Sequence, residues 1–194
     1  MAQARRIARP PGVTYAVSNT GPLISAFQSN SVGLLTQIFQ VIHVPMACIL
    51  ELEEHGWKAE IRAAAPRLIR VKLTSREEKR ALDIARKIAR HPASSDPAAA
   101  SHLGEAQAIV VSRRPEHRTD LLLLDEAAAR AIAKEAGVRF SGFPGVLLLA
   151  TQGKLISAEE LKARLDACRA KGTHYGAGFI QRVYDMARRA RRRL

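Results

Sequence analysis

The chain has 194 residues, 47% of them hydrophobic and 25% charged, and its 31 Lys and Arg against 18 Asp and Glu give a formal net charge of +13. This composition excludes a disordered chain and indicates one packed domain with a small appendage. The charge favours a polyanionic partner such as RNA, the alternative being a solvated basic surface, and the isolated Cys48 and Cys168 exclude a disulfide framework.

The N-terminal segment lacks the pattern of a secretory signal. Residues 1–12 are basic and end in Pro10-Pro11-Gly12, which predicts a flexible leader. The apolar segment of a secretory signal does not follow, and no apolar run is long enough to span a bilayer. We therefore expect a cytoplasmic protein with no membrane partner.

Apolar segments and helical patterns alternate through the first third of the chain. Residues 15–17 predict a short buried strand, followed by a helix that has Pro22 in its first turn. Residues 40–44 predict a second strand. The next helix covers residues 46–56, because Gly56 suits the position just past a helix end.

The middle of the chain continues this alternation. Residues 68–73 alternate apolar and basic side chains, which predicts a half-exposed strand. A capping box formed by Ser75 and Glu78 predicts the start of a helix. Residues 91–101 are rich in Pro, Ala and Ser and predict a loop, and residues 104–113 predict another helix.

Four consecutive leucines form the strongest strand signal. Residues 121–124 predict a buried strand that ends at Asp125, and we expect Asp125 to cap a helix over residues 126–136. Residues 137–140 predict a last short strand, and residues 142–150 a further helix.

The pattern changes after Lys154. A capping box of Ser157 and Glu160 predicts a helix that runs to Ala170, and a final helix begins near Phe179 and ends in an arginine cluster. We expect this cluster to contact RNA backbone, the alternative being a solvated helix end. The cluster consists of Arg188, Arg189, Arg191, Arg192 and Arg193.

Strands that alternate with helices predict an α/β fold with three layers, α/β/α, around a short, mostly parallel sheet, followed by C-terminal helices. We divide the chain into the leader (1–12), an α/β domain (13–153) and a C-terminal helical extension with a basic tail (154–194). In such folds ligands bind at the carboxyl ends of the strands.

Four polar residues fall where such a site would form. Asn19 ends the first strand, and Glu51 lies in the helix after the second strand. Glu105 opens a helix, and Asp125 ends the leucine strand. Clustered carboxylates repel one another, and a Mg²⁺ or Mn²⁺ ion relieves the repulsion and activates a water for attack on a phosphodiester.

Each of these residues also has a structural alternative. Asn19 suits a turn, Glu51 an exposed acidic helix face, Glu105 a helix N-terminus and Asp125 an N-cap. A metal site is therefore favoured by their combination and not by any one of them.

Five segments, taken in order, resemble the PIN-domain family, which includes the VapC-like ribonucleases. The likeness extends over about residues 14–190, and the chain is similar to an uncharacterised prokaryotic branch of this family. The segments are residues 17–24 (VSNTGPLI), 44–52 (VPMACILEL), 103–109 (LGEAQAI), 123–126 (LLDE) and 142–148 (GFPGVLL).

The resemblance implies a PIN-like fold and a Mg²⁺- or Mn²⁺-dependent endoribonuclease that forms a homodimer. It also implies the toxin of a toxin–antitoxin pair, with an antitoxin protein as partner. The implied catalytic residues are Asn19, Glu51, Glu105 and Asp125, the last three as metal ligands, with Thr20 and Glu126 as flanking candidates.

Position 19 departs from the family pattern, because catalytic members carry Asp there. Asn19 offers a carbonyl oxygen but no charge, which weakens metal affinity. The alternative function is therefore a catalytically degenerate PIN-like module that binds nucleic acid or protein.

Overall fold

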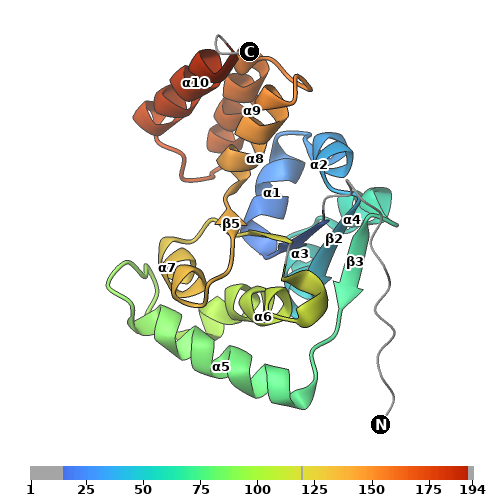
Figure 1. Ribbon diagram of the computed structural model, residues 1–194, viewed down its shortest axis with the longest axis vertical. Helices are drawn as coiled ribbons and strands as arrows, with labels where there is room; N and C mark the ends of the chain where they lie inside the picture. The colour runs from blue at the N-terminus through green and yellow to red at the C-terminus, as the bar shows by residue number, and fades with distance from the viewer. Residues whose placement is uncertain (1–14, 119, 192–194) are drawn as a thin grey trace.

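The computed structural model describes residues 15–118 and 120–191. Within them, five strands form one parallel sheet in the order β3-β2-β1-β4-β5 (Figure 1). The predicted α/β class is confirmed, and the sheet that we expected to be mostly parallel is parallel throughout its described strands. The strands are β1 (Tyr15–Ser18), β2 (Val41–Pro45), β3 (Leu68–Val71), β4 (Leu121–Leu123) and β5 (Phe140–Ser141).

Helices connect the strands and follow the last of them. Two short helices, α2 and α4, were not predicted, since each has seven residues and only two buried positions, too few for a helical period to show. No helix in the described part of the chain is long and apolar enough to cross a bilayer. The helices are α1 (Thr20–Gln28), α2 (Val32–Ile38), α3 (Met46–Glu54), α4 (Lys58–Ala64), α5 (Ser75–Arg90), α6 (Leu103–Ser112), α7 (Ala127–Glu135), α8 (Phe143–Gln152), α9 (Ala158–Ala170) and α10 (Ala177–Arg191), with 3-10 turns η1 (Ala99–His102) and η2 (Pro115–His117).

Side-chain alternation along the strands divides the core into two layers. Successive side chains of a strand point to opposite faces, so Ala16 and Leu123 join one hydrophobic cluster and Val17 and Leu122 join the other. The first cluster holds α1, α3 and α8, and the second holds α5, α6 and α7. Figure 1 shows these two groups of helices on opposite sides of the sheet.

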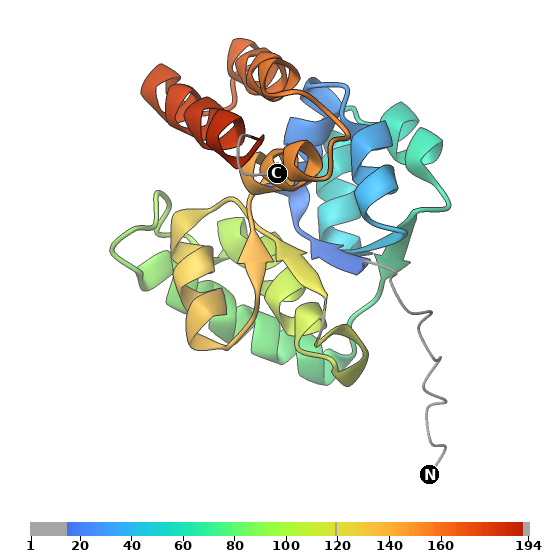
Figure 2. The same cartoon turned by 45° about the horizontal axis from the view of Figure 1, so that its top comes forward.

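The two C-terminal helices pack onto the first of these clusters. Buried Leu161 and Leu165 of α9 and Ile180 and Val183 of α10 belong to the same cluster as Leu23 of α1. Figure 2 shows α9 and α10 beside α8, beyond the helices that cover the sheet. The proposed boundary between residues 153 and 154 falls in the connection from α8 to α9.

The start of α5 corrects one sequence prediction. The capping box is formed by Thr74 and Glu77, one residue earlier than the expected pair of Ser75 and Glu78. Thr74 N–H donates to Glu77 Oε2 at 2.8 Å, and Glu77 N–H donates to Thr74 Oγ1 at 3.3 Å. Glu77 of this earlier pair also has a partner outside α5.

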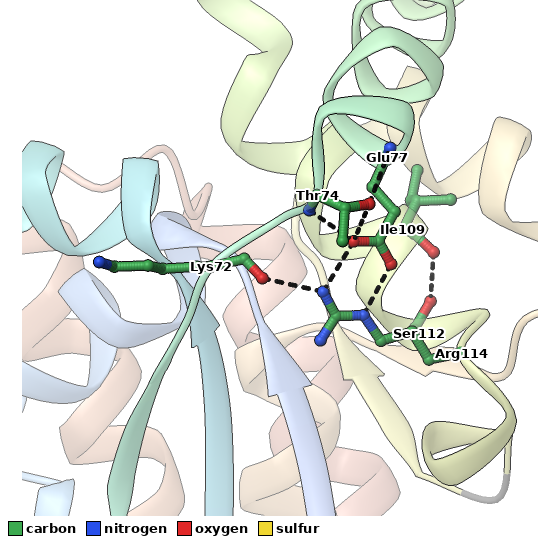
Figure 3. A network of polar contacts seen from close by, with 6 residues as sticks. All are labelled: Lys72, Thr74, Glu77, Ile109, Ser112 and Arg114. Carbon is green, nitrogen blue, oxygen red and sulfur yellow. Dashed lines mark hydrogen bonds and ion pairs between the residues drawn. The ribbon is translucent and has the colours of Figure 1, made fainter. Parts of the chain in front are cut away.

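That partner is Arg114, which follows α6 (Figure 3). Its guanidinium donates to Glu77 Oε1 at 2.8 Å and to Oε2 at 2.9 Å, and also to the Lys72 carbonyl at 2.9 Å. The hydrogen bond from Arg114 lowers the pKa of Glu77 to about 2, against the effect of its partial burial. This network joins the beginning of α5 to the end of α6.

Other predicted helix ends agree with the structure. Gly56 lies just past α3 with φ of +87°, a conformation that glycine adopts without strain. Ser157 and Glu160 form the expected capping box of α9, which ends at Ala170 as predicted.

Candidate functional site

The residues that we predicted to form a site lie at the carboxyl-terminal edge of the sheet. Asn19 follows β1 and Asp125 follows β4, and these two strands are paired with Ser18 opposite Leu123. The backbone N–H of Asn19 donates to the Leu123 carbonyl at 3.2 Å, which continues the ladder one residue past β1. The paired strand ends therefore fix Asn19 and Asp125 at the same edge.

Two hydrogen bonds join polar side chains from three helices at this edge. Nδ2 of Asn19 donates to Oε1 of Glu105 on α6 at 3.0 Å. Oγ1 of Thr20 donates to Oε2 of Glu51 on α3 at 2.6 Å. We call this cluster, together with the neighbouring carboxylates, the acidic site: Asn19, Thr20, Glu51, Glu105, Asp125 and Glu126.

Gly104 permits the close approach of α6 to the other helices. A Cβ at this position would lie 3.2 Å from Cys48 Sγ, 3.5 Å from Glu51 Oε2 and 3.8 Å from Thr20 Oγ1. A larger residue would push against this cluster, so the glycine is what lets Glu105 sit next to Glu51. The fully buried Cys48 stays a neutral thiol, because burial raises its pKa to about 12.

Glu105 lies in an environment that disfavours its negative charge. Burial raises its pKa, and the charges of Glu51 and Glu126 raise it further, against a backbone hydrogen bond and the charge of His102, which lower it. Carboxylates that destabilise each other in this way are stabilised by a cation between them.

Asp125 is held by two donors from outside the cluster. Its Oδ1 accepts from the backbone N–H of Phe143 at 2.9 Å, and its Oδ2 accepts from the hydroxyl of Tyr175 at 3.4 Å. Burial nevertheless raises the pKa of Asp125 to about 6, because these hydrogen bonds and the charge of Arg130 offset only part of the desolvation. The group therefore titrates near neutral pH.

The helix cap that we predicted for Asp125 is wrong. Glu126, not Asp125, is the N-cap of α7, and its Oε2 accepts from the Ala129 N–H at 2.5 Å. Asp125 instead points toward the start of α8, where the backbone N–H of Phe143, the first residue of that helix, donates a hydrogen bond to Oδ1 of Asp125. The N-cap function thus passes to the next residue and leaves Asp125 at the sheet edge.

One oxygen atom of the acidic site lacks a hydrogen-bond partner in the described part of the chain. Oδ1 of Asn19 is buried and has no hydrogen-bond partner among the described residues, and the whole residue is only 2% exposed. A buried polar oxygen without a partner is costly. A hard divalent cation or a water bound to it would satisfy this oxygen.

The donor atoms of the site are all oxygens, which fits Mg²⁺ or Mn²⁺. Glu51, Glu105 and Asp125 are not among the described groups whose ligand atoms all lie within 4.8 Å of one another. This spacing fits an ion that keeps several of its waters, as Mg²⁺ does, better than an ion held directly by every carboxylate.

Two members of the predicted arginine cluster lie in the described part of α10 with their side chains described. Arg188 and Arg189 are exposed on α10, and the Arg188 guanidinium lies 5.7 Å from the centroid of the Tyr184 ring. At 1.5 Å per residue, Arg188 is roughly 16 Å along the axis from the start of α10 at Ala177. The Arg191 side chain, Arg192, Arg193 and the leader of residues 1–12 lie outside the described residues.

Tyr175 was not among the predicted site residues. It lies between α9 and α10, and its hydroxyl is within 3.2 Å of Ser25 Oγ on α1 as well as near Asp125. Burial and the charge of Asp125 raise its pKa, so the hydroxyl keeps its proton. A single tyrosine in a glycine-rich segment carries no spacing signal that would link it to a residue fifty positions earlier.

Comparison with known proteins gives one match. The sequence model of a family described as a PIN domain matches residues 15–189. No curated protein and no solved structure gives a significant match. The matched region begins with β1 and ends within α10, so it includes the acidic site, α9 and most of α10.

Proposed function

This chain belongs to the PIN-domain family, a nuclease-type fold, and on that premise we propose that it is a Mg²⁺- or Mn²⁺-dependent endoribonuclease that hydrolyses RNA phosphodiester bonds. The observation that carries the proposal is the buried Oδ1 of Asn19, which lacks a partner beside the carboxylates of the acidic site. A bound cation would supply an activated water and stabilise the charge on the phosphodiester. The net charge of +13 supports an RNA substrate.

Each residue of the acidic site has a distinct role in the proposal. Glu51, Glu105 and Asp125 would hold the cation with the Asn19 carbonyl oxygen. Thr20 fixes the Glu51 carboxylate through its 2.6 Å hydrogen bond. Glu126 adds negative charge near Glu105 while it caps α7.

A second candidate function rests on the other atom of Asn19. Its Nδ2 donates to Glu105, which gives that carboxylate a partner without a cation. This bond supports a catalytically degenerate module that binds nucleic acid or protein.

Cleavage of labelled single-stranded RNA distinguishes the two functions. We expect the wild-type protein to cleave RNA with Mn²⁺ or Mg²⁺, to lose cleavage in EDTA, and to lose it at least about 100-fold in Glu51→Gln. Glu54→Gln is the matched control, because Glu54 is an exposed carboxylate one turn away on the same helix. Binding without cleavage, with cleavage gained in Asn19→Asp, would support the degenerate module.

The partners and the location extend the proposal. A toxin of a toxin–antitoxin pair would carry its positive charge toward an acidic antitoxin, and a homodimer and a cytoplasmic location accord with such a role. Light scattering of the purified protein tests the homodimer. Growth arrest on expression, relieved by a neighbouring gene product, tests the toxin role.

A further inference from the structure

A second group of ligand-type side chains lies beside the start of β4, whereas Asp125 of the acidic site follows the end of that strand. His43 belongs to β2, His117 ends η2, and Asp120 directly precedes β4. Each side chain offers one ligand atom, and the three atoms lie within 4.8 Å of one another. Among the described residues, these three form the one group of His, Cys, Asp or Glu side chains with this spacing.

The histidine–carboxylate pair in this group is buried. The side chains of His117 and Asp120 are 6% and 1% exposed, and Nδ1 of His117 lies 2.8 Å from Oδ2 of Asp120. The ring centroid of His43, which is half-buried, lies 4.3 Å from that of His117 with 54° between the ring planes. These contacts hold two imidazoles and one carboxylate close together, and both are ligand types of transition metals.

We propose that His43, His117 and Asp120 bind one Zn²⁺-type ion, separate from the cation of the acidic site. Two imidazole nitrogens and one carboxylate oxygen suit Zn²⁺, whereas the all-oxygen acidic site suits Mg²⁺ or Mn²⁺. Ligands of tetrahedral zinc lie about 3.4 Å apart, so the present spacing of up to 4.8 Å would close by about 1 Å. A water would be the fourth ligand of such an ion.

The position of the group in the sheet gives the ion a structural role. β2 and β4 lie on either side of β1, and the group joins β2 to the turn that leads into β4. An ion there would connect the two neighbours of the central strand. Binding to the folded chain alone raises the free energy of unfolding by mass action.

Zinc retention by the full chain tests this site without any measurement of activity. The protein is dialysed with Zn²⁺, then against metal-free buffer, and the retained zinc is measured by mass spectrometry. We expect about one Zn²⁺ per wild-type chain, and an affinity at least about tenfold lower in His43→Gln. His55→Gln is the matched control, because His55 is an exposed histidine just after α3.

The outcomes separate this site from the proposed function. Glu105→Gln, which alters the acidic site, should retain zinc as the wild type does. The proposal is overturned if the wild-type chain retains no zinc, if His43→Gln retains as much, or if zinc is lost in Glu105→Gln alone. Circular dichroism checks that His43→Gln is folded, and Co²⁺ absorption bands that depend on His43 give an independent measurement of the same ligands.

Discussion

The burial of Asp125 has a cost in stability when its carboxylate is ionised. In the folded chain its pKa is raised to about 6, mainly by burial, from an ordinary value of 3.8. The folded state therefore binds more protons than the unfolded state between these values, so the free energy of unfolding falls as the pH rises from about 4 to 6. Above that range the buried charge destabilises the protein unless a cation is bound.

Asp125→Asn removes this charge and keeps an oxygen for the Phe143 N–H. In EDTA at pH 7.5 we expect the variant to be more stable than the wild type by about 1–2 kcal/mol, and metal-dependent cleavage to fall at least about 100-fold. Urea denaturation at pH 7.5 and pH 3.5 checks the stability, and the difference should nearly vanish at the lower pH. A variant that is less stable at pH 7.5 would contradict the raised pKa.

Tyr175 lowers the pKa of Asp125 by donating a hydrogen bond to its ionised form. Tyr175→Phe removes this donor, so the pKa of Asp125 should rise, and the pH of half-maximal cleavage should move upward by about half a unit. The pH–rate profile measures the shift. Tyr184→Phe is the control, since its hydroxyl contacts Glu159, away from the acidic site; an equal shift in both variants, or none in Tyr175→Phe, would exclude this role.

At the scale of elements, the start of α8 depends on Gly142. A Cβ there would lie 2.4 Å from Asp125 Oδ1, a distance that forces the carboxylate to move. We expect Gly142→Ala to weaken Mn²⁺ binding about tenfold in calorimetry, because Asp125 loses its place at the α8 N-terminus. In Gly33→Ala of α2, where nothing lies within 4 Å, the affinity should be unchanged and the helix slightly more stable. Unchanged binding in Gly142→Ala would show that Asp125 is not positioned this way.

The junction of α5 and α6 depends on the pair of Arg114 and Glu77. Its partners are 21% and 16% exposed, and Arg114→Met should cost about 1–2 kcal/mol at pH 7. Because the pKa of Glu77 is lowered to about 2, this stability is present above about pH 4.5 and is lost as the pH falls toward 2.

Chemical denaturation at pH 7 and pH 2.5 measures this loss. Arg86→Met is the control, because Arg86 and Asp83 form a pair whose side chains are 53% and 68% exposed, and its removal should cost little. A cost for Arg114→Met that does not shrink at low pH would show that packing, rather than the ion pair, stabilises the junction.

Single residues and secondary-structure elements both show what the sequence could predict. Asn19 and Asp125 could be placed together, because the ends of parallel strands meet at one edge and their positions after apolar runs are readable. The two hydrogen-bond donors to Asp125, the Phe143 N–H and the Tyr175 hydroxyl, could not be predicted, since they depend on how α8 and the segment before α10 pack. The prediction placed the cap of α5 one residue too late, and the Arg114 partner of Glu77, 37 positions away, could not be predicted either.

For the whole molecule, the two proposed sites lie at different places on one sheet. The carboxyl-terminal edge gathers oxygen atoms from the residues after β1 and β4 and from α3 and α6, and the other group holds two histidines and an aspartate beside the start of β4. The C-terminal helices share the hydrophobic cluster of α1 and bring Tyr175 to the acidic site. The chain therefore acts as one unit, in which packing far from β1 affects the titration of a carboxylate beside it.

The central claim is that the acidic site binds a divalent cation although Asn19 replaces a carboxylate. Anomalous diffraction from crystals soaked in Mn²⁺ tests it most directly, because the ion's position is observed without reference to any activity. We predict an anomalous peak within coordination or water-bridged distance of Asn19 Oδ1, Glu51, Glu105 and Asp125. The claim would be contradicted if wild-type crystals at saturating Mn²⁺ showed a well-ordered acidic site without a peak, while crystals of Asn19→Asp did show one.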